Sequence, residues 1–380
     1  MCPRSIFLDG QATTQLDPIV AEAMAPFHLH RFGNPHSLDN EHGRDVSRAI
    51  ADATLMIAGS INAEPHEIFY TSGATESNNW LVHNIAYWSQ TRKIHIVVSQ
   101  LEHASLLEPI GRLNKNRVEV SYLVPNQHGL VSAKNVAASI RDNTVLVSVM
   151  AVNNEIGVIQ PIREIGDICA EKGVLFHCDA AQAIGKIPFD VQTSNLDFAS
   201  LSSHKAYGPM GIGALYISNS HIKRFEPMIT GGGQQKGLRS GTLPVSLCVG
   251  MGAAYNLARE RGKQDDAHLK RCQKMILSAL APYKDRFEIN GSLDQRVPSN
   301  LNFQFRDKLA EHFLVTHPEL SLSLGSACKS ASDRGSHVLE AIGLTAEQID
   351  RSFRLSFSRT TSENEVNNIA EIMAAYLKRS

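Results

Sequence analysis

Hydrophobic runs rich in β-branched residues alternate with amphipathic stretches along the first part of the chain. Seven such runs fall between about residues 67 and 218, namely EIFYTSG, IHIVVS, VEVSYL, VLVSVMAV, VLFHCD, LDFASLS and IGALYIS. Their alternation with helical stretches is typical of a mainly parallel sheet. The segment 161–173 is a clear intervening helix, because its isoleucines recur at three-residue spacing and Gly173 follows as a C-cap. The pattern therefore predicts an α/β fold in which helices cover a seven-stranded sheet.

A different pattern begins near Tyr255. A long, charged helical stretch is followed by the apolar run NLNFQF and by the helical segments SHVLEAIG and EVNNIAEIMAAYLKR. We therefore expect a smaller α+β domain, formed by residues 1–14 and 259–380, beside a large domain over residues 15–258. The length of 380 residues fits two domains.

Composition disfavours several classes of protein. The chain carries 37 basic and 38 acidic side chains, so its charge disfavours broad electrostatic binding to nucleic acid. The sequence shows no signal-peptide pattern and no run of 18 apolar residues. Its six cysteines form no C-x-x-C pair, which fits a reducing compartment and disfavours a protein-only metal site. We expect a cytoplasmic enzyme without a metal that contacts neither membrane nor nucleic acid directly.

A lysine and an acid follow two of the apolar runs. Lys205 lies among small and polar residues in SSHKAYGPMGIG, directly after LDFASLS, and Asp179 ends VLFHCD. At the ends of neighbouring strands, this pair suits pyridoxal phosphate, because the lysine would hold the aldehyde as a Schiff base and the acid would keep the ring nitrogen protonated. Taken singly, each has an ordinary explanation, as a solvated lysine and as a helix cap. Gln182, one turn past Asp179, would reach the phenolic oxygen of the ring and favours the cofactor.

A phosphate site is indicated by the segment EIFYTSGATESNNW. Gly73 lies at the turn from a strand into a helix that begins at Ala74 and Thr75. Free N–H groups at a helix start, together with the Thr75 hydroxyl, would bind a phosphate. Ser202 and His204 would add two donors from the turn after the sixth strand. The alternative is an ordinary capped helix without a ligand.

The chain resembles the cysteine desulfurases of the NifS/IscS type, within the class V aminotransferases of the fold-type I pyridoxal-phosphate enzymes. Ten motifs occur in the order and at the approximate spacing of that family, namely LDGQATT, FGNPHS, TSGATESNN, LEHAS, VNNEIG, HCDAAQ, SSHKAYGPMGIGALY, GGGQQKGLRSGTLPV, GSACKSAS and FRLSFSRTT. The resemblance implies a homodimer that removes sulfur from L-cysteine, releases L-alanine and passes a persulfide to an acceptor protein. The sulfur would serve iron–sulfur assembly, tRNA thiolation or DNA phosphorothioation.

The resemblance also gives roles to residues around the cofactor. Lys205 would bind the aldehyde and Asp179 the ring nitrogen, and two amides would contact the ring substituents, Asn153 and Gln182. The phosphate would be bound by small and polar residues of the same subunit, namely Ala74, Thr75, Ser202 and His204. Thr242 would reach the phosphate held by the neighbouring subunit, which implies composite active sites.

Two residues would carry the sulfur chemistry. Cys328, in the small and polar run GSACKSAS, resembles the nucleophile that leaves carrying the persulfide. His103 resembles the acid or base stacked on the cofactor; without the motif, it is equally a half-buried histidine at a strand end. Lys329 would favour the Cys328 thiolate if the two side chains face each other, although neighbouring loop side chains often diverge.

The substrate carboxylate would be bound by an arginine. Arg354 in FRLSFSR matches the family residue that forms a bidentate pair with it. Asn34 and Asn153 would assist. Arg359 is the nearby competitor, but its spacing is unfavourable for this role.

Three other functions fit the sequence less well. A selenocysteine lyase, or a desulfurase of the other subgroup, resembles R-x-G-H-H-C-A rather than the SLGSACKSA of this chain. A sulfur-carrier scaffold without catalysis would not need Lys205, Asp179 and Arg354 intact. A dinucleotide-dependent dehydrogenase is disfavoured because no G-x-G-x-x-G opens a helix after a strand.

Overall fold

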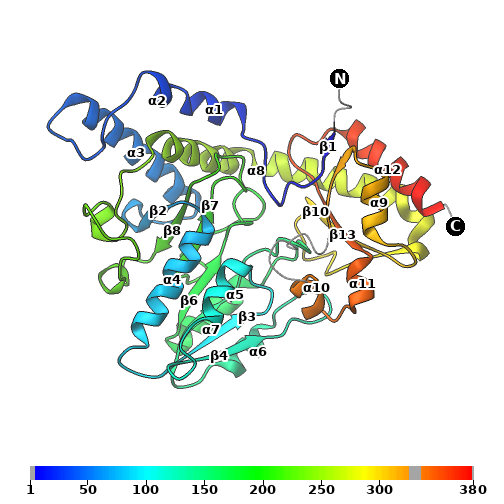
Figure 1. Ribbon diagram of the computed structural model, residues 1–380, viewed down its shortest axis with the longest axis horizontal. Helices are drawn as coiled ribbons and strands as arrows, with labels where there is room; N and C mark the ends of the chain where they lie inside the picture. Colours follow the sequence, from blue (N-terminus) through cyan, green and yellow to red (C-terminus); the bar gives the residue numbers. More distant parts are fainter. Residues whose placement is uncertain (1–4, 325–334, 379–380) are drawn as a thin grey trace.

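Two sheets lie side by side in the computed structural model, which describes residues 5–324 and 335–378. The larger sheet and its helices occupy one side of Figure 1, and the smaller sheet occupies the other. The long helix α8 (Val245–Leu280) runs from one part to the other.

The larger sheet contains seven strands in the order β2-β8-β7-β6-β5-β3-β4. The strands are β2 (Ile68–Thr71), β3 (Ile94–Ser99), β4 (Val118–Leu123), β5 (Thr144–Ser148), β6 (Leu175–Asp179), β7 (Phe198–Ser202) and β8 (Gly213–Ile217). All neighbours pair in parallel except β8, which is antiparallel to both β2 and β7. All strands but the edge strand β4 are buried over most of their length, which explains their continuous apolar runs. The predicted mainly parallel seven-stranded sheet is confirmed.

Helices surround this sheet as expected for an α/β fold (Figure 1). They are α1 (Pro18–Met24), α2 (Pro26–Leu29), α3 (Glu41–Ser60), α4 (Ala74–Trp88), α5 (Ala104–Gly111), α6 (Ala133–Ser139) and α7 (Ile162–Lys172), with short 3-10 turns η1 (Pro65–Glu67), η2 (Ile222–Arg224) and η3 (Gln235–Gly237). The predicted helix at 161–173 is confirmed, since α7 follows Pro161 and ends at Gly173 with a left-handed φ of 64°.

The start of α8 differs from the sequence expectation. The charged helical pattern begins near Tyr255, but the helix begins ten residues earlier, at Val245. Gly250 and Gly252 lower the helix propensity of this first part. Both are required by packing, because a Cβ at Gly250 would lie 2.5 Å from the Met24 sulfur and one at Gly252 would lie 2.6 Å from the Ala53 Cα.

The smaller sheet is antiparallel, in the order β12-β13-β10-β9. Its strands are β9 (Phe287–Ile289), β10 (Asn300–Phe305), β12 (Ser323–Leu324) and β13 (Ser352–Ser356). A separate parallel pair joins β1 (Ile6–Phe7) to β11 (Leu320–Ser321). The accompanying helices are η4 (Ala281–Arg286), α9 (Ala310–Thr316), α10 (His337–Ala341), α11 (Ala346–Asp350) and α12 (Glu363–Lys378).

Each sheet has its own hydrophobic core, and α8 contributes to both. Cys248, Met251 and Tyr255 pack into the core of the larger part. Further along the same helix, Cys272 and Ile276 pack into the aromatic core of the smaller part. The predicted boundary between residues 258 and 259 falls inside this continuous helix, and it stays a prediction.

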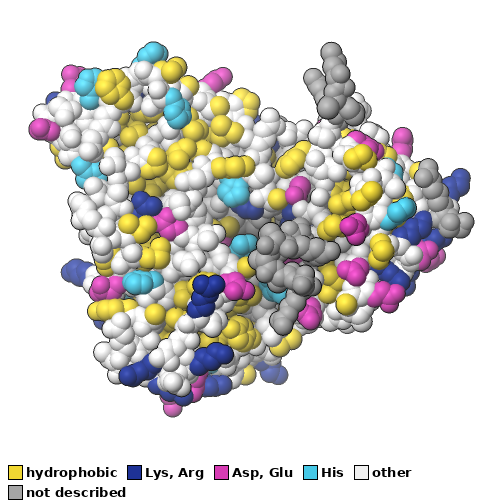
Figure 2. Space-filling model, viewed as in Figure 1, with side chains coloured by type: hydrophobic (Ala, Val, Ile, Leu, Met, Phe, Trp, Pro, Cys, Tyr) yellow, Lys and Arg dark blue, Asp and Glu magenta, His cyan; other side chains and the backbone are white. Residues whose placement is uncertain are grey.

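Basic and acidic side chains are interspersed over the face shown in Figure 2, in keeping with the net charge of −1. Within residues 5–324 and 335–378, no helix is long and apolar enough to cross a membrane. In the same ranges, no group of three or more His, Cys, Asp or Glu side chains is placed to bind a metal ion.

Candidate active site

The carboxyl ends of β6 and β7 bring Asp179 and Lys205 to one edge of the larger sheet. Asp179 is the last residue of β6, and Lys205 lies in the turn that follows β7. Asp179 is only 4% exposed; its Oδ2 accepts a hydrogen bond from Asn78 Nδ2 at 2.8 Å, and its Oδ1 accepts one from Ala181 N–H at 3.0 Å. One oxygen therefore caps the turn after β6, which is the ordinary capping role considered for this acid, and the other oxygen is bound by Asn78.

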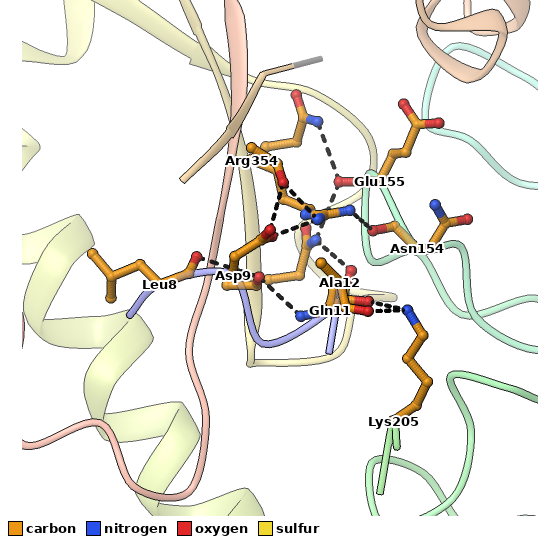
Figure 3. Close-up of polar contacts among 12 residues, drawn as sticks. Leu8, Asp9, Gln11, Ala12, Asn154, Glu155, Lys205 and Arg354 are labelled. Carbon is orange, nitrogen blue, oxygen red and sulfur yellow. Dashed lines mark hydrogen bonds and ion pairs between the residues drawn. The ribbon is translucent and has the colours of Figure 1, made fainter. Parts of the chain in front are cut away.

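Lys205 is not a solvated lysine. Its Nζ donates to the carbonyl oxygens of Gln11 at 2.7 Å and Ala12 at 2.6 Å (Figure 3). Burial and, to a smaller extent, the nearby Arg354 charge lower its pKa, and the charges of Asp9 and Asp179 partly offset both effects, so that the net pKa is about 8. A substantial fraction of this amine is therefore neutral near physiological pH, as attack on an aldehyde requires.

Gln11 is a site residue that the sequence did not single out. Its carbonyl oxygen accepts hydrogen bonds from Lys205 Nζ and from Gln182 Nε2, the latter at 2.9 Å. Its side-chain oxygen accepts another from Asn300 Nδ2 at 2.8 Å. The motif LDGQATT signalled this segment, but the contacts to the lysine use backbone atoms, which the residue type does not reveal.

Gln182 has a second partner that was not anticipated. Lys186 Nζ donates to Gln182 Oε1, one helical turn further along. Burial lowers the pKa of Lys186 to about 7, with smaller contributions from the charges of Lys205 and Arg354. The side-chain oxygen of Gln182 thus accepts from Lys186, and one of its two amide hydrogens is donated to the Gln11 carbonyl. The second amide hydrogen remains free to donate to a ligand.

The residues expected to bind phosphate come from two strands that flank β8. Ser202 of β7 and Thr71 of β2 are both register partners of Gly213 in β8. Ala74 and Thr75, the first residues of α4, follow β2 in sequence. Among the described residues, the N–H groups of these two have no hydrogen-bond partner. The predicted donors of both segments therefore meet at one edge of the sheet.

The turn before α4 leaves room for a ligand. Gly73, the residue that precedes the helix, has a φ of 152° and no described atom within 4 Å of an added Cβ. His204 lies across this edge, with its Nδ1 3.0 Å from Thr13 Oγ1. Burial lowers the pKa of His204 to about 4, assisted by the charges of Lys205 and Lys186. His204 is therefore a neutral hydrogen-bonding partner near pH 7.

His103 is the N-cap of α5. Its Nδ1 accepts a hydrogen bond from Ser105 N–H at 3.1 Å, so the neutral ring carries its proton on Nε2. Desolvation by the surrounding protein lowers the pKa of His103, while the charge of Asp179 acts to raise it and that of Lys205 to lower it. Part of the surface of this residue nevertheless stays open to solvent. The arrangement leaves Nε2–H available as a proton donor.

Asn153 is committed to its own turn. Its Oδ1 accepts from the N–H groups of Glu155 at 2.8 Å and Ile156 at 2.9 Å, and its Nδ2 donates to the Leu101 carbonyl at 3.1 Å and lies 3.4 Å from the Met150 sulfur. Direct contact of Asn153 with cofactor or substrate stays a prediction.

Arg354 projects from β13 toward the large part of the molecule. Its Nη2 pairs with Asp9 Oδ1 at 2.5 Å, and its Nη1 donates to the Asn154 carbonyl at 2.8 Å (Figure 3). The Nε atom is buried and has no partner among the described residues. The competitor Arg359 pairs through Nη1 with Asp17 at 3.1 Å and through Nη2 with Asp265 at 2.9 Å, and its Nε is likewise buried without a partner among the described residues. Of the two arginines, Arg354 is the one whose charge acts on the Lys205 amine.

Several residues predicted for the site lie away from this cluster or outside the residues that the structure describes. Asn34 is exposed in the loop between α2 and α3, where its Oδ1 accepts from His36 N–H, and Figure 1 shows this loop well apart from β13. Thr242 is exposed just before α8. Cys328 and Lys329 lie outside the described residues, so their roles stay predictions.

Comparison with known proteins gives the family of the chain. Residues 6–369 match the family described as aminotransferase class V. The chain belongs to this family. Cysteine desulfurase IscS from Rickettsia bellii (strain OSU 85-389) is 43% identical to it over 374 residues, which is 98% of this chain and 91% of that protein. The predicted relationship to the NifS/IscS-type proteins is thus confirmed.

Solved structures agree with this assignment. A NifS-like protein matches with a TM-score of 0.90 and 32% identity over 98% of this chain and 99% of the other. A structure of SspA in complex with cysteine matches with a TM-score of 0.81 and 35% identity over 94% and 100% of the two chains. The fold-type I architecture is confirmed, and the chain is an enzyme of a pyridoxal-phosphate-dependent family.

The described residues fit this cofactor. A partly neutral lysine amine suits its aldehyde, a buried acid suits its ring nitrogen, and the open N–H groups at the start of α4 suit its phosphate. These three groups lie at the same edge of the larger sheet.

Proposed function

We propose that this enzyme is a cysteine desulfurase, which transfers the sulfur of L-cysteine to Cys328 and releases L-alanine. The observation that carries the proposal is the joint placement of Lys205, Asp179 and Arg354, since both Asp179 and Arg354 influence the pKa of the lysine amine. The relatives named cysteine desulfurase and the cysteine-bound SspA structure support L-cysteine as substrate.

The side chains divide the work of binding and proton transfer. Arg354 binds the substrate carboxylate, with its unpartnered Nε as the free donor. Pyridoxal phosphate, when bound, supplies the electron sink that stabilises negative charge on the substrate carbon atoms. Lys205 removes the Cα proton, and His103 exchanges a proton with the substrate thiol through Nε2.

Sulfur transfer then consumes only the substrate and one enzyme thiol. The Cys328 thiolate attacks the substrate sulfur, so an S–S bond forms while the Cβ–S bond breaks. The electron pair of the broken bond stays on Cβ, which is protonated to give the methyl group of alanine. The sum is one cysteine and one enzyme thiol converted into alanine and an enzyme persulfide, without an external oxidant.

We also propose that the enzyme works as a homodimer with composite sites. Asn34 and Thr242 are both exposed, and Asn34 lies in a loop well apart from β13 (Figure 1). A second subunit gives each of them a route to an active site. Substitution of Thr242 by Val, with dimer mass and cofactor affinity measured together, tests this: we expect an intact dimer with weaker cofactor binding.

The persulfide then passes to an acceptor protein in iron–sulfur assembly, tRNA thiolation or DNA phosphorothioation, in the cytoplasm. The four cysteines within the described ranges, Cys169, Cys178, Cys248 and Cys272, are buried and free, which suits a reducing compartment. Labelled sulfur loaded on Cys328 in a cell lysate identifies the acceptor by the protein that becomes labelled.

Three variants test the desulfurase proposal. Lys205→Ala is expected to lose covalent cofactor binding and alanine production. Cys328→Ser is expected to bind cofactor and cysteine but to form no persulfide. The control Cys169→Ala, at a buried position on α7, should keep both products. Normal persulfide or sulfide production by Cys328→Ser contradicts the assignment of the nucleophile.

A further inference from the structure

A cavity of about 510 Å³ lies behind the candidate active site. It is bounded by α8, by the loop 184–189 that follows Gln182, and by the end of α3 at Ser60. Its volume is in the range of pockets that hold small organic ligands. No role in the proposed desulfurase reaction uses this space.

Three cations surround the opening of the cavity. Arg259, Lys263 and Lys270 lie on one side of α8, and all three are exposed. The acid among the lining residues, Asp266, is already paired with Lys270 at 2.8 Å. Arg259 and Lys263 form no ion pair with any described residue. The rim therefore carries a net positive charge.

The inner surface of the cavity is largely apolar. It includes Ile184, Ile187, Phe189 and the ring of Tyr255. Tyr255 is held in place by a hydrogen bond from its hydroxyl to the Ser202 carbonyl at 3.3 Å, so the wall is anchored to β7. An apolar interior with a cationic rim suits a ligand that has an apolar body and one anionic group.

A glycine of α8 borders the cavity. Gly262 lies within the 36-residue helix α8 and lines the cavity, and no described atom lies within 4 Å of a Cβ added there. Packing does not require this glycine, in contrast to Gly250 and Gly252 of the same helix. Glycine in a helix interior is less favourable than alanine, because it loses more conformational freedom on folding. Here, that cost coincides with an open space beside the helix.

We propose that this cavity binds an organic anion, with its carboxylate, sulfonate or phosphate at Arg259 and Lys263 and its apolar body against Ile187 and Phe189. The site is separate from the cofactor site, although Lys186 contacts both: it lines the cavity, and its Nζ holds Gln182. This ligand site goes beyond the proposed desulfurase function and does not depend on it.

Anilinonaphthalene sulfonate, which joins an apolar ring system to one sulfonate, is a suitable probe. Its fluorescence and its stoichiometry by equilibrium dialysis are measured on the cofactor-loaded protein, so that the cofactor phosphate site is filled. We expect about one tight site per chain. Gly262→Leu should weaken binding by about tenfold or more because it fills the cavity, whereas Gly262→Ala should change it by less than about twofold.

A second pair of variants tests the charge. Lys263→Glu should weaken binding by roughly fivefold or more, whereas Lys274→Glu, at an exposed position of α8 outside the cavity, should leave it unchanged. Desulfurase activity of Gly262→Leu without the probe should equal that of the unmodified protein, which shows that the variant folds.

Three results would overturn the proposal. One is unchanged probe binding in Gly262→Leu. Another is equal weakening by Lys263→Glu and Lys274→Glu, which indicates attraction by general charge. The third is an altered oligomeric state of Gly262→Leu, which makes the cavity an interface between copies of the chain.

Discussion

Arg354 and Asp9 form an ion pair that joins β13 to the N-terminal segment, with Nη2 and Oδ1 2.5 Å apart. Both groups are largely buried, and Ser323 Oγ lies 2.7 Å from Asp9 Oδ2 and 2.9 Å from Arg354 Nη2. The guanidinium proposed to bind the substrate carboxylate therefore already contacts a carboxylate. A substrate must share Arg354 with Asp9.

Asp9→Asn is expected to tighten substrate binding. The amide keeps the shape of the side chain but removes the competing charge, so the KM for cysteine should fall by about threefold or more. The protein without substrate should lose stability, because a buried cation is left without its partner, and cysteine should restore part of that loss. Steady-state kinetics and thermal unfolding with and without cysteine check both effects.

The control for this variant is Asp45→Asn. Asp45 pairs with Arg31 at 2.9 Å on an exposed surface, where an ion pair contributes little to stability. It should leave KM unchanged. A higher KM in Asp9→Asn would show that Asp9 orients Arg354 for the substrate and does not compete with it.

His103→Asn should separate the fold of α5 from proton transfer. Asparagine is a good N-cap, so the helix keeps its start, but the Nε2–H donor is lost. We expect a fall in kcat of about 10²–10⁴-fold with cofactor still bound. Ser105→Ala keeps the ring and should cost much less. Full activity in His103→Asn would exclude the proton-transfer role.

The pH dependence of cofactor attachment should follow the amine of Lys205. Its pKa is lowered to about 8, so the neutral form increases as pH rises toward that value. The rate at which the cofactor-free protein takes up pyridoxal phosphate should rise with pH and level off above about 8. Absorbance of the bound cofactor after rapid mixing measures it. A rate that keeps rising to pH 10 would mean that the amine has an ordinary pKa.

The Lys205 amine also makes the stability of the folded protein depend on pH. Between the lowered pKa of about 8 and the model-peptide value of 10.5, the unfolded chain binds more protons at this lysine than the folded chain does. Stability from this group therefore rises with pH across that window. Lys205→Met in the cofactor-free protein should be stabilised near pH 7, and its advantage should shrink between about pH 8 and 10.5.

The sequence was sufficient for the sheet because parallel strands buried on both faces are continuous apolar runs, and seven runs correspond to seven strands. It was insufficient for the start of α8, because Gly250 and Gly252 lower the helix propensity there. Both positions are glycine because a neighbouring helix packs too closely to leave room for a side chain. Local pattern carries no information about a partner that lies nearly 200 residues away in the chain.

The candidate site, too, could be predicted only in part from the sequence. Lys205 and Asp179 follow strands and were predicted from that position. Asp9 was missed because its partner, Arg354, comes from the other end of the chain. Gln11 was missed because it acts on the lysine through a backbone carbonyl, which every residue type possesses.

Lys186 is expected to be a positioning residue for the cofactor ring. Its Nζ holds Gln182 Oε1, which leaves a Gln182 N–H free to face the ligand. Lys186→Met should let this amide rotate, which alters the absorbance spectrum of the bound cofactor and lowers kcat more than it changes KM. Lys186→Arg keeps a hydrogen-bond donor at this position and should restore the spectrum. An unchanged spectrum in Lys186→Met would remove this role.

The crossing of α3 and α8 gives a prediction about the fold itself, because two glycines of one helix should respond to alanine in opposite ways. A Cβ at Gly252 would lie 2.6 Å from the Ala53 Cα, a backbone atom that cannot move aside, so Gly252→Ala should destabilise the protein by about 1–3 kcal/mol. Gly262 has open space, so Gly262→Ala should stabilise it by roughly 0.5–1 kcal/mol. Denaturant unfolding of the two variants measures both changes. Equal stabilisation by both would mean that α3 and α8 do not approach so closely at Ala53.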